Sequence, residues 1–209
     1  MHVDCTGSTL KSEHLTLLAK SIRMIGLPLD GSSIETHTAM RGDKGKSHFV
    51  LVLDLLDALS DTPILIKVNT VVSKVNIDDI PNMVSILSKH RVDFWSIYQY
   101  WPFAGNGSIN SRHIIDDGRF DEVVRKLSKT PVHFNIEINP ISERLNTYFF
   151  VFHSGDVYMT TQDVPTDYIF LGSIFDDKTI SLWFESNAAS LRSSSLVRYQ
   201  ELLSSEVIK

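Results

Sequence analysis

Five side chains of the sequence are suited to binding a polar ligand: Asp30, Ser32, Arg41, Asn69 and Gln99. An asparagine amide can bond ribose hydroxyls, and a glutamine offers both a donor and an acceptor. An arginine can hold a carboxylate through two parallel hydrogen bonds. The aromatic residues of Tyr98–Trp101 could stack on a base. Together these groups fit a nucleoside-like ligand that carries a carboxylate.

Each of these residues also has a structural interpretation. Asp30 with Ser32 fits the N-cap of a helix, and Arg41 fits a solvated loop. The aromatic residues of Tyr98–Trp101 fit a core. Asn69 differs because it lies within an apolar run, where a buried amide needs hydrogen-bond partners. Those partners could equally belong to a neighbouring loop.

Apolar runs that alternate with amphipathic helical patterns must position these groups. The expected strands are His2–Cys5, Ile22–Leu29, Ile64–Val72, Asp93–Trp101 and Val132–Ile138. The run Ile64–Val72 is almost continuously apolar, which predicts a strand covered on both faces. Strands joined through helices form a parallel sheet, and ligands bind at the carboxyl ends of such strands. The candidate residues lie near those ends.

The alternation stops after about Pro140. The sequence then predicts a hairpin around Ser154-Gly155-Asp156, a further strand within Asp167–Asp177, and a closing helix at Ser194–Val207. We therefore expect an α/β barrel-like body at residues 1–140 and an α+β extension at residues 141–209 that packs on it.

Composition excludes several functional classes. A net charge of −5 without a basic run argues against a nucleic-acid partner. No stretch approaches the roughly 18 apolar residues of a membrane span. A single cysteine, Cys5, excludes an internal disulfide and fits a cytoplasmic setting. The eight histidines show no metal-ligating spacing, and the sequence has no nucleophile elbow, P-loop or dinucleotide fingerprint.

Several motifs, in the right order, resemble the middle and end of a radical S-adenosylmethionine (SAM) enzyme. They are the turn Thr6–Leu10, the L-D-G motif Leu29–Gly31, the pair Arg41-Gly42, and the strands Ile66–Asn76 and Trp95–Gly107. The last two are especially similar to viperin-like members. The resemblance is good up to about Gly105 and loose beyond it.

The resemblance implies a partial (β/α)6 TIM-type barrel that holds SAM across its strand ends. Arg41 would meet the methionine carboxylate, Asn69 the ribose, and Gln99 the neighbourhood of the adenine. Asp30 and Ser32 would belong to the same cofactor-binding end. Pro28 stands where family members often have a serine, so one side-chain hydrogen bond is lost.

The chain departs from the family in having no C-x-x-x-C-x-x-C motif and no Gly-Gly-Glu segment. The resemblance therefore implies the C-terminal fragment of a radical SAM oxidoreductase, inactive alone. A 4Fe-4S cluster would be bound only in a parent protein with the missing N-terminal segment, and that segment or a second copy would be the partner. Two alternatives stay open: a non-catalytic SAM- or nucleotide-binding or interaction module, and an unrelated α/β barrel hydrolase or isomerase.

Overall fold

A computed structural model describes residues 1–42, 45–102, 111–144, 149–160, 168–179 and 181–182. The described residues form two compact units. The first contains those from Met1 to Tyr100 and from Ser111 to Pro140, and the second contains Trp101, Pro102 and those from Ile141 onward.

The first unit alternates strands and helices. Its strands are β1 (His2–Asp4), β2 (Met24–Pro28), β3 (Leu65–Val72), β4 (Phe94–Gln99) and β5 (Asn135–Asn139). Its α-helices are α1 (Ser12–Ser21), α2 (Ile34–Arg41), α3 (Gly45–Leu59), α4 (Ile80–Leu87) and α5 (Asp117–Leu127). Short 3-10 turns lie at Ile77–Asp79 and Ser111–His113.

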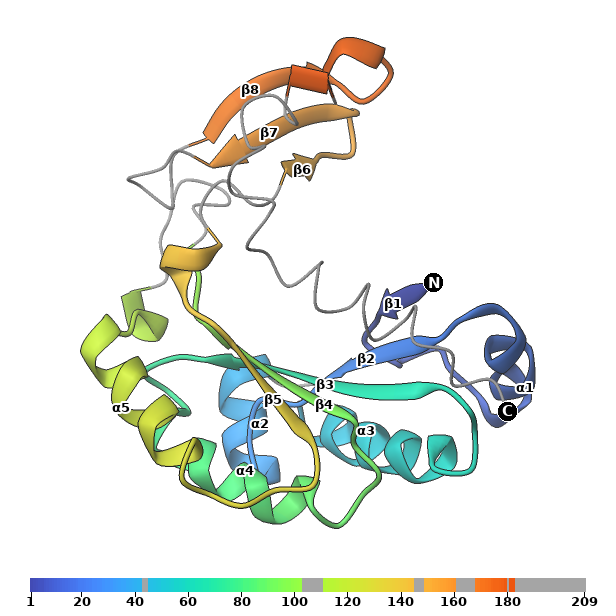
Figure 1. The fold of residues 1–209 in the computed structure, drawn as a ribbon, viewed down its shortest axis with the longest axis vertical. Helices are drawn as coiled ribbons and strands as arrows, with labels where there is room; N and C mark the ends of the chain where they lie inside the picture. The colour runs from blue at the N-terminus through green and yellow to red at the C-terminus, as the bar shows by residue number, and fades with distance from the viewer. Residues whose placement is uncertain (43–44, 103–110, 145–148, 161–167, 180, 183–209) are drawn as a thin grey trace. The chain divides into compact units, whose positions relative to one another are not determined.

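The five strands form a parallel sheet in the order β1-β2-β3-β4-β5, which is also their order in the chain. Helices α2, α3, α4 and α5 all lie on one face of this sheet (Figure 1). A doubly wound sheet reverses its strand order and carries helices on both faces, whereas a barrel keeps the sequence order with its helices outside. The predicted partial barrel-like α/β fold is therefore confirmed.

The core of the first unit lies between the sheet and its helices. Ile25, Val68 and Trp95 of the strands belong to one buried cluster with Leu56 of α3 and Phe120 of α5. Their side chains are at most 1% exposed. The apolar spacing of the helices produces this core, because residues three and four apart share one helix face.

Local hydrogen bonds fix where two helices begin. Ser33 caps α2 by accepting from the Thr36 amide at 3.3 Å, and Asp116 caps α5 by accepting from the Arg119 amide at 2.9 Å. Helix α3 begins at Gly45 and contains Ser47 in its first turn.

The second unit contains a three-stranded antiparallel sheet in the order β6-β7-β8. The strands are β6 (Phe149–Val151), β7 (Asp156–Thr160) and β8 (Tyr168–Ser173). The antiparallel pairs β6–β7 and β7–β8 confirm the predicted hairpin and the further strand. Gly155 lies in the hairpin turn with a φ of +87°, which glycine adopts without strain. The closing helix predicted at Ser194–Val207 lies outside the described residues. In the described ranges, no helix is long and apolar enough to cross a bilayer.

Candidate functional site

One face of the parallel sheet carries a set of polar side chains in register. Alternate residues of a strand point to opposite faces, and paired positions of neighbouring strands point to the same face. The apolar set that includes Val68 and Trp95 packs toward the helices, so the alternate set faces the other way. The alternate set also contains apolar residues such as Met24, Leu65 and Phe94. We give the name polar sheet face to Gly26 and these polar members of the set: His2, Asp4, Lys67, Asn69, Ser96, Tyr98, Glu137 and Asn139.

A hydrogen bond joins strands β1 and β3 across this face. Asn69 Nδ2 donates to Asp4 Oδ1 at 2.7 Å, over the intervening strand β2. Gly26 of β2 makes this bond possible, because a Cβ there would lie 1.7 Å from Asp4 Oδ1 and 2.8 Å from Asn69 Nδ2. A side chain at position 26 would therefore separate the pair.

The surroundings of Asp4 favour its charged form. Burial by itself would raise the pKa of the Asp4 carboxyl. The hydrogen bond from His2, the charge of Lys67 and the hydrogen bond from Asn69 outweigh burial and lower the pKa below its ordinary value. Asp4 is thus a carboxylate at neutral pH and can only accept hydrogen bonds from Asn69.

The carbonyl oxygen of Asn69 is the unusual atom of this site. Because Nδ2 is held by Asp4, Oδ1 must point the other way. Asn69 Oδ1 is buried and has no hydrogen-bond partner among the residues that the structure describes. A buried polar atom without a partner costs free energy, so such an atom in a folded protein needs an explanation. A ligand that donates a hydrogen bond would provide one.

Strands β3, β4 and β5 supply further polar groups to the same face. Lys67 Nζ donates to the Tyr98 hydroxyl at 3.1 Å and lies 5.7 Å from the centre of the Tyr98 ring. Ser96 donates to a carboxylate oxygen of Glu137 on β5. Lys67 is 3% exposed and Ser96 is fully buried, so this half of the face holds its polar groups in fixed positions.

The structure brings two of the predicted residues together at the carboxyl end of β2. Arg41 Nε lies 2.8 Å from Asp30 Oδ2, and the Val71 amide donates to Asp30 Oδ1 at 2.8 Å. Burial raises the pKa of Asp30, against the opposing effects of Arg41 and the Val71 amide. The contact recorded for this ion pair is made by Nε of Arg41.

Two histidines linked by a hydrogen bond lie beside this pair. The Asp30 amide donates to His37 Nδ1 at 3.0 Å, which leaves the proton of a neutral His37 on Nε2. Nε2 lies 2.9 Å from His48 Nδ1, and His48 Nε2 lies 2.9 Å from the Thr6 carbonyl oxygen. Burial, with the charges of Arg41 and His48, lowers the pKa of His37 to about 4. The two histidines thus connect the β1–α1 turn to the carboxyl end of β2 through hydrogen bonds.

Ser32 and Gln99 have separate protein partners. The Ser32 amide and hydroxyl donate to the carboxylate of Asp79 at 2.7 and 2.6 Å. Gln99 is on the helix-facing side of β4, and its Nε2 donates to Asp117 of α5 at 2.7 Å. The ligand roles implied for these residues stay predictions.

The candidate residues predicted from sequence did not include four residues of this face: Asp4, Lys67, Ser96 and Glu137. Their signal was an alternation with period two inside runs that look continuously apolar, as in Lys67 and Asn69. The run Ile64–Val72, predicted to be a strand covered on both faces, carries a lysine and an asparagine on its second face, and Lys67 there is buried.

A serine–histidine pair near the end of β3 does not fit a nucleophilic site. Ser73 Oγ lies 3.2 Å from His113 Nδ1. Ser73 is fully buried, and its Oγ also contacts the Val75 amide and Met40 Sδ at 3.1 Å each. A nucleophile must reach a substrate, so these contacts favour a structural role.

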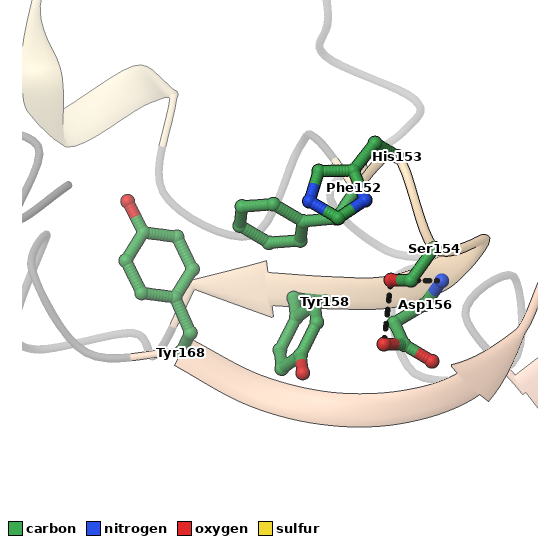
Figure 2. A pocket seen from close by; sticks show the side chains of 6 residues that line it. All are labelled: Phe152, His153, Ser154, Asp156, Tyr158 and Tyr168. Carbon is green, nitrogen blue, oxygen red and sulfur yellow. Dashed lines mark hydrogen bonds between the residues drawn. The ribbon is translucent and has the colours of Figure 1, made fainter. Parts of the chain in front are cut away.

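The second unit has a shallow pocket of about 290 Å³, shown in Figure 2. It is lined by Phe152, His153, Ser154, Asp156, Tyr158 and Tyr168. The Ser154 hydroxyl donates to Asp156 Oδ2 at 2.7 Å within the hairpin turn. The lining is therefore mainly aromatic, and two of its polar groups bind each other.

Comparison with solved structures shows the same fold in Streptococcus suis SuiB. One crystal structure of SuiB matches with a TM-score of 0.59 at 13% identity, over 88% of this chain and 48% of SuiB. A second, of SuiB bound to S-adenosylmethionine, matches with a TM-score of 0.60 at 13% identity, over 92% of this chain and 50% of SuiB. The chain thus spans about half the length of SuiB. No protein-family model and no curated protein sequence matches it.

Proposed function

We propose that this chain is the SAM-binding part of a radical SAM enzyme and that SAM lies against the polar sheet face. The observation that supports this proposal most strongly is the buried Oδ1 of Asn69 on that face, which has no partner in the described part of the chain. The motifs from Thr6 to Gly105 and the fold shared with SAM-bound SuiB point to the same ligand.

Two groups of SAM find partners among these residues: the ribose diol and the methionine carboxylate. Asn69 Oδ1 can accept a hydrogen bond from a ribose hydroxyl. The terminal nitrogens of Arg41 can donate to the methionine carboxylate while Nε stays bound to Asp30. Because Asp30 holds Arg41, the guanidinium is already oriented before the ligand arrives, which lowers the entropic cost of binding.

The described residues do not fit an iron–sulfur cluster. The chain has one cysteine, and no group of three His, Cys, Asp or Glu side chains in the described ranges is placed to hold a metal ion. In the proposed enzyme the cluster ligands belong to another segment. Reductive cleavage of SAM is the chemistry that the family's cluster supplies, and this chain contributes the binding and orientation of SAM.

The experiment that tests the proposal is isothermal titration calorimetry of SAM into the iron-free 209-residue chain. We expect saturable binding at one site per chain. Asn69→Leu should weaken binding about tenfold, because it removes one buried hydrogen bond at nearly constant volume. Asn82→Ala is the matched control, since Asn82 is exposed on α4 and bonds only Asp79 in the described contacts.

Two results would contradict the proposal. One is no binding at millimolar SAM, and the other is an equal loss of affinity in Asn69→Leu and Asn82→Ala. Titration with adenosine tests the alternative of a general nucleotide-binding module. Equal affinities for adenosine and SAM would favour that module, because the methionine carboxylate would then contribute nothing.

A further inference from the structure

We propose that Asp4 is a positioning residue that orients the Asn69 amide, so that the site selects ligands by a hydroxyl that donates a hydrogen bond. This inference rests on the proposed function and adds a specificity to it. It assigns a role to a β1 residue that none of the sequence motifs includes.

The first step is the orientation of the amide. A free asparagine side chain can rotate by half a turn and exchange its donor for its acceptor. The carboxylate of Asp4 accepts from Asn69 Nδ2 at 2.7 Å and has no proton to give to Oδ1. Rotation of the amide would place Asn69 Oδ1 against Asp4 Oδ1, and neither oxygen carries a proton to donate. Asp4 therefore fixes the Asn69 amide with its nitrogen toward Asp4 and its oxygen, which is buried, directed away from Asp4.

The second step is the set of contacts that keeps Asp4 charged and in place. His2 Nε2 lies 3.1 Å from the same Oδ1 of Asp4, and Lys67 on β3 adds a positive charge nearby. The Asp4 side chain is 54% exposed, so solvent also stabilises the carboxylate. The orientation of Asn69 is thus maintained at neutral pH.

The third step is the space above β2. Gly26 pairs with Asp4 on one side and Lys67 on the other, and it has no side chain to block the Asp4–Asn69 bond. Gly26 has a negative φ, so alanine suits the backbone there. Gly26→Ala would therefore break the bond by displacing Asp4 while leaving both polar residues in the chain.

The consequence is a chemical preference that can be measured. An oxygen fixed as an acceptor binds a hydroxyl but gains nothing from a fluorine, which resembles a hydroxyl in size and cannot donate. When Asp4 no longer holds the amide, Asn69 can present its NH₂ group instead, and the two ligands become more alike. If Asp4 orients the amide, SAM should bind more tightly than an analogue in which fluorine replaces the ribose hydroxyl that donates to Asn69.

The test is calorimetric titration with SAM and with its 2′-deoxy-2′-fluoro and 3′-deoxy-3′-fluoro analogues. In the unchanged chain, we expect one analogue to bind about five- to tenfold more weakly than SAM, the value of one hydrogen bond. In Asp4→Asn and in Gly26→Ala, the ratio should fall to about twofold or less. Gly118→Ala on α5 is the control for Gly26→Ala and should keep the original ratio. Thermal unfolding checks that each variant is folded.

The outcomes separate the two proposals. If the unchanged chain binds SAM and both analogues equally, or if the ratio survives in Asp4→Asn and Gly26→Ala, the role of Asp4 is overturned and the proposed function stands. If the unchanged chain does not bind SAM, both proposals are overturned. A purely structural role of Asp4 would lower the affinity for all three ligands together and leave the ratio unchanged.

Discussion

At the scale of single residues, the Asp30–Arg41 pair shows how one contact can serve both the fold and a ligand. The Asp30 side chain is 5% exposed and Arg41 is 28% exposed, so the carboxylate depends on Arg41 for much of its charge compensation. Removing one partner of a buried pair leaves an uncompensated charge, which costs more than the pair itself contributes.

We predict that Arg41→Ala lowers the free energy of unfolding by about 2 kcal/mol, because it leaves Asp30 buried and unpaired. Adding Asp30→Asn to this variant should recover part of the loss. Urea unfolding monitored by circular dichroism measures both effects.

Arg119→Ala provides the comparison for Arg41→Ala. Arg119 pairs with Asp78, which is 89% exposed, so its loss should cost less than about 1 kcal/mol. Equal costs for the two arginine variants would contradict the structural importance of the Asp30–Arg41 pair.

His37 gives a prediction about pH. Its pKa is about 4 in the folded chain against an ordinary value of 6.5, so the unfolded chain binds a proton that the folded chain rejects. The stabilising effect of the neutral His37 is present above pH 6.5 and is lost as the pH falls toward 4, by roughly 3 kcal/mol. His37→Asn keeps an acceptor for the Asp30 amide and does not titrate.

The measurement is the free energy of unfolding of both chains in steps from pH 7 to pH 4. The unchanged chain should lose more stability than His37→Asn over this range, and the difference isolates His37 from the other titrating groups. The same pH slope in both chains would show that His37 is not held neutral by the fold.

The residues of the site were only partly predictable from sequence. Asn69 stood out because an amide in an apolar run needs partners. Its partner Asp4 is 65 positions away, and their contact depends on the register of β1, β2 and β3 and on the absence of a side chain at Gly26. The sequence contains no local sign of that register, so the contact between Asp4 and Asn69 could not be found from it, although the period-two alternation marks Asp4 as a polar strand residue.

At the scale of elements, the sheet and the helices form because their apolar residues repeat with different periods. The strands and helices of the first unit were predictable, since each has its own local pattern. The start of α3 was not, because Gly45 approaches α2 closely: a Cβ there would lie 2.4 Å from Thr38 Cα. Packing between two helices accompanies that boundary.

Two residues of helix α3 allow a matched test of how this helix packs on the core. Leu56 is fully buried in the core, whereas Val50 on the same helix is 47% exposed. We predict that Leu56→Ala lowers the free energy of unfolding by about 2–5 kcal/mol through a cavity, and that Val50→Ala changes it by less than about 0.5 kcal/mol. Chemical denaturation of both variants is the measurement, and similar costs would contradict the assigned helix face.

At the scale of the whole molecule, the proposed SAM site lies in the first unit. That unit has a sheet with one apolar face packed on helices and one polar face, and the polar face carries the unpartnered oxygen of Asn69. The chain spans about half the length of SuiB, with which it shares this fold.

The most direct test of the central claim is a titration of the ¹⁵N-labelled chain with SAM, followed by amide chemical shifts. The account predicts saturable shifts at Asp4, Gly26, Asn69 and Ser96, with little change at Phe152 or Tyr158 in the pocket of the second unit. Shifts confined to that pocket, or no saturable shifts on the polar sheet face at millimolar SAM, would contradict the account.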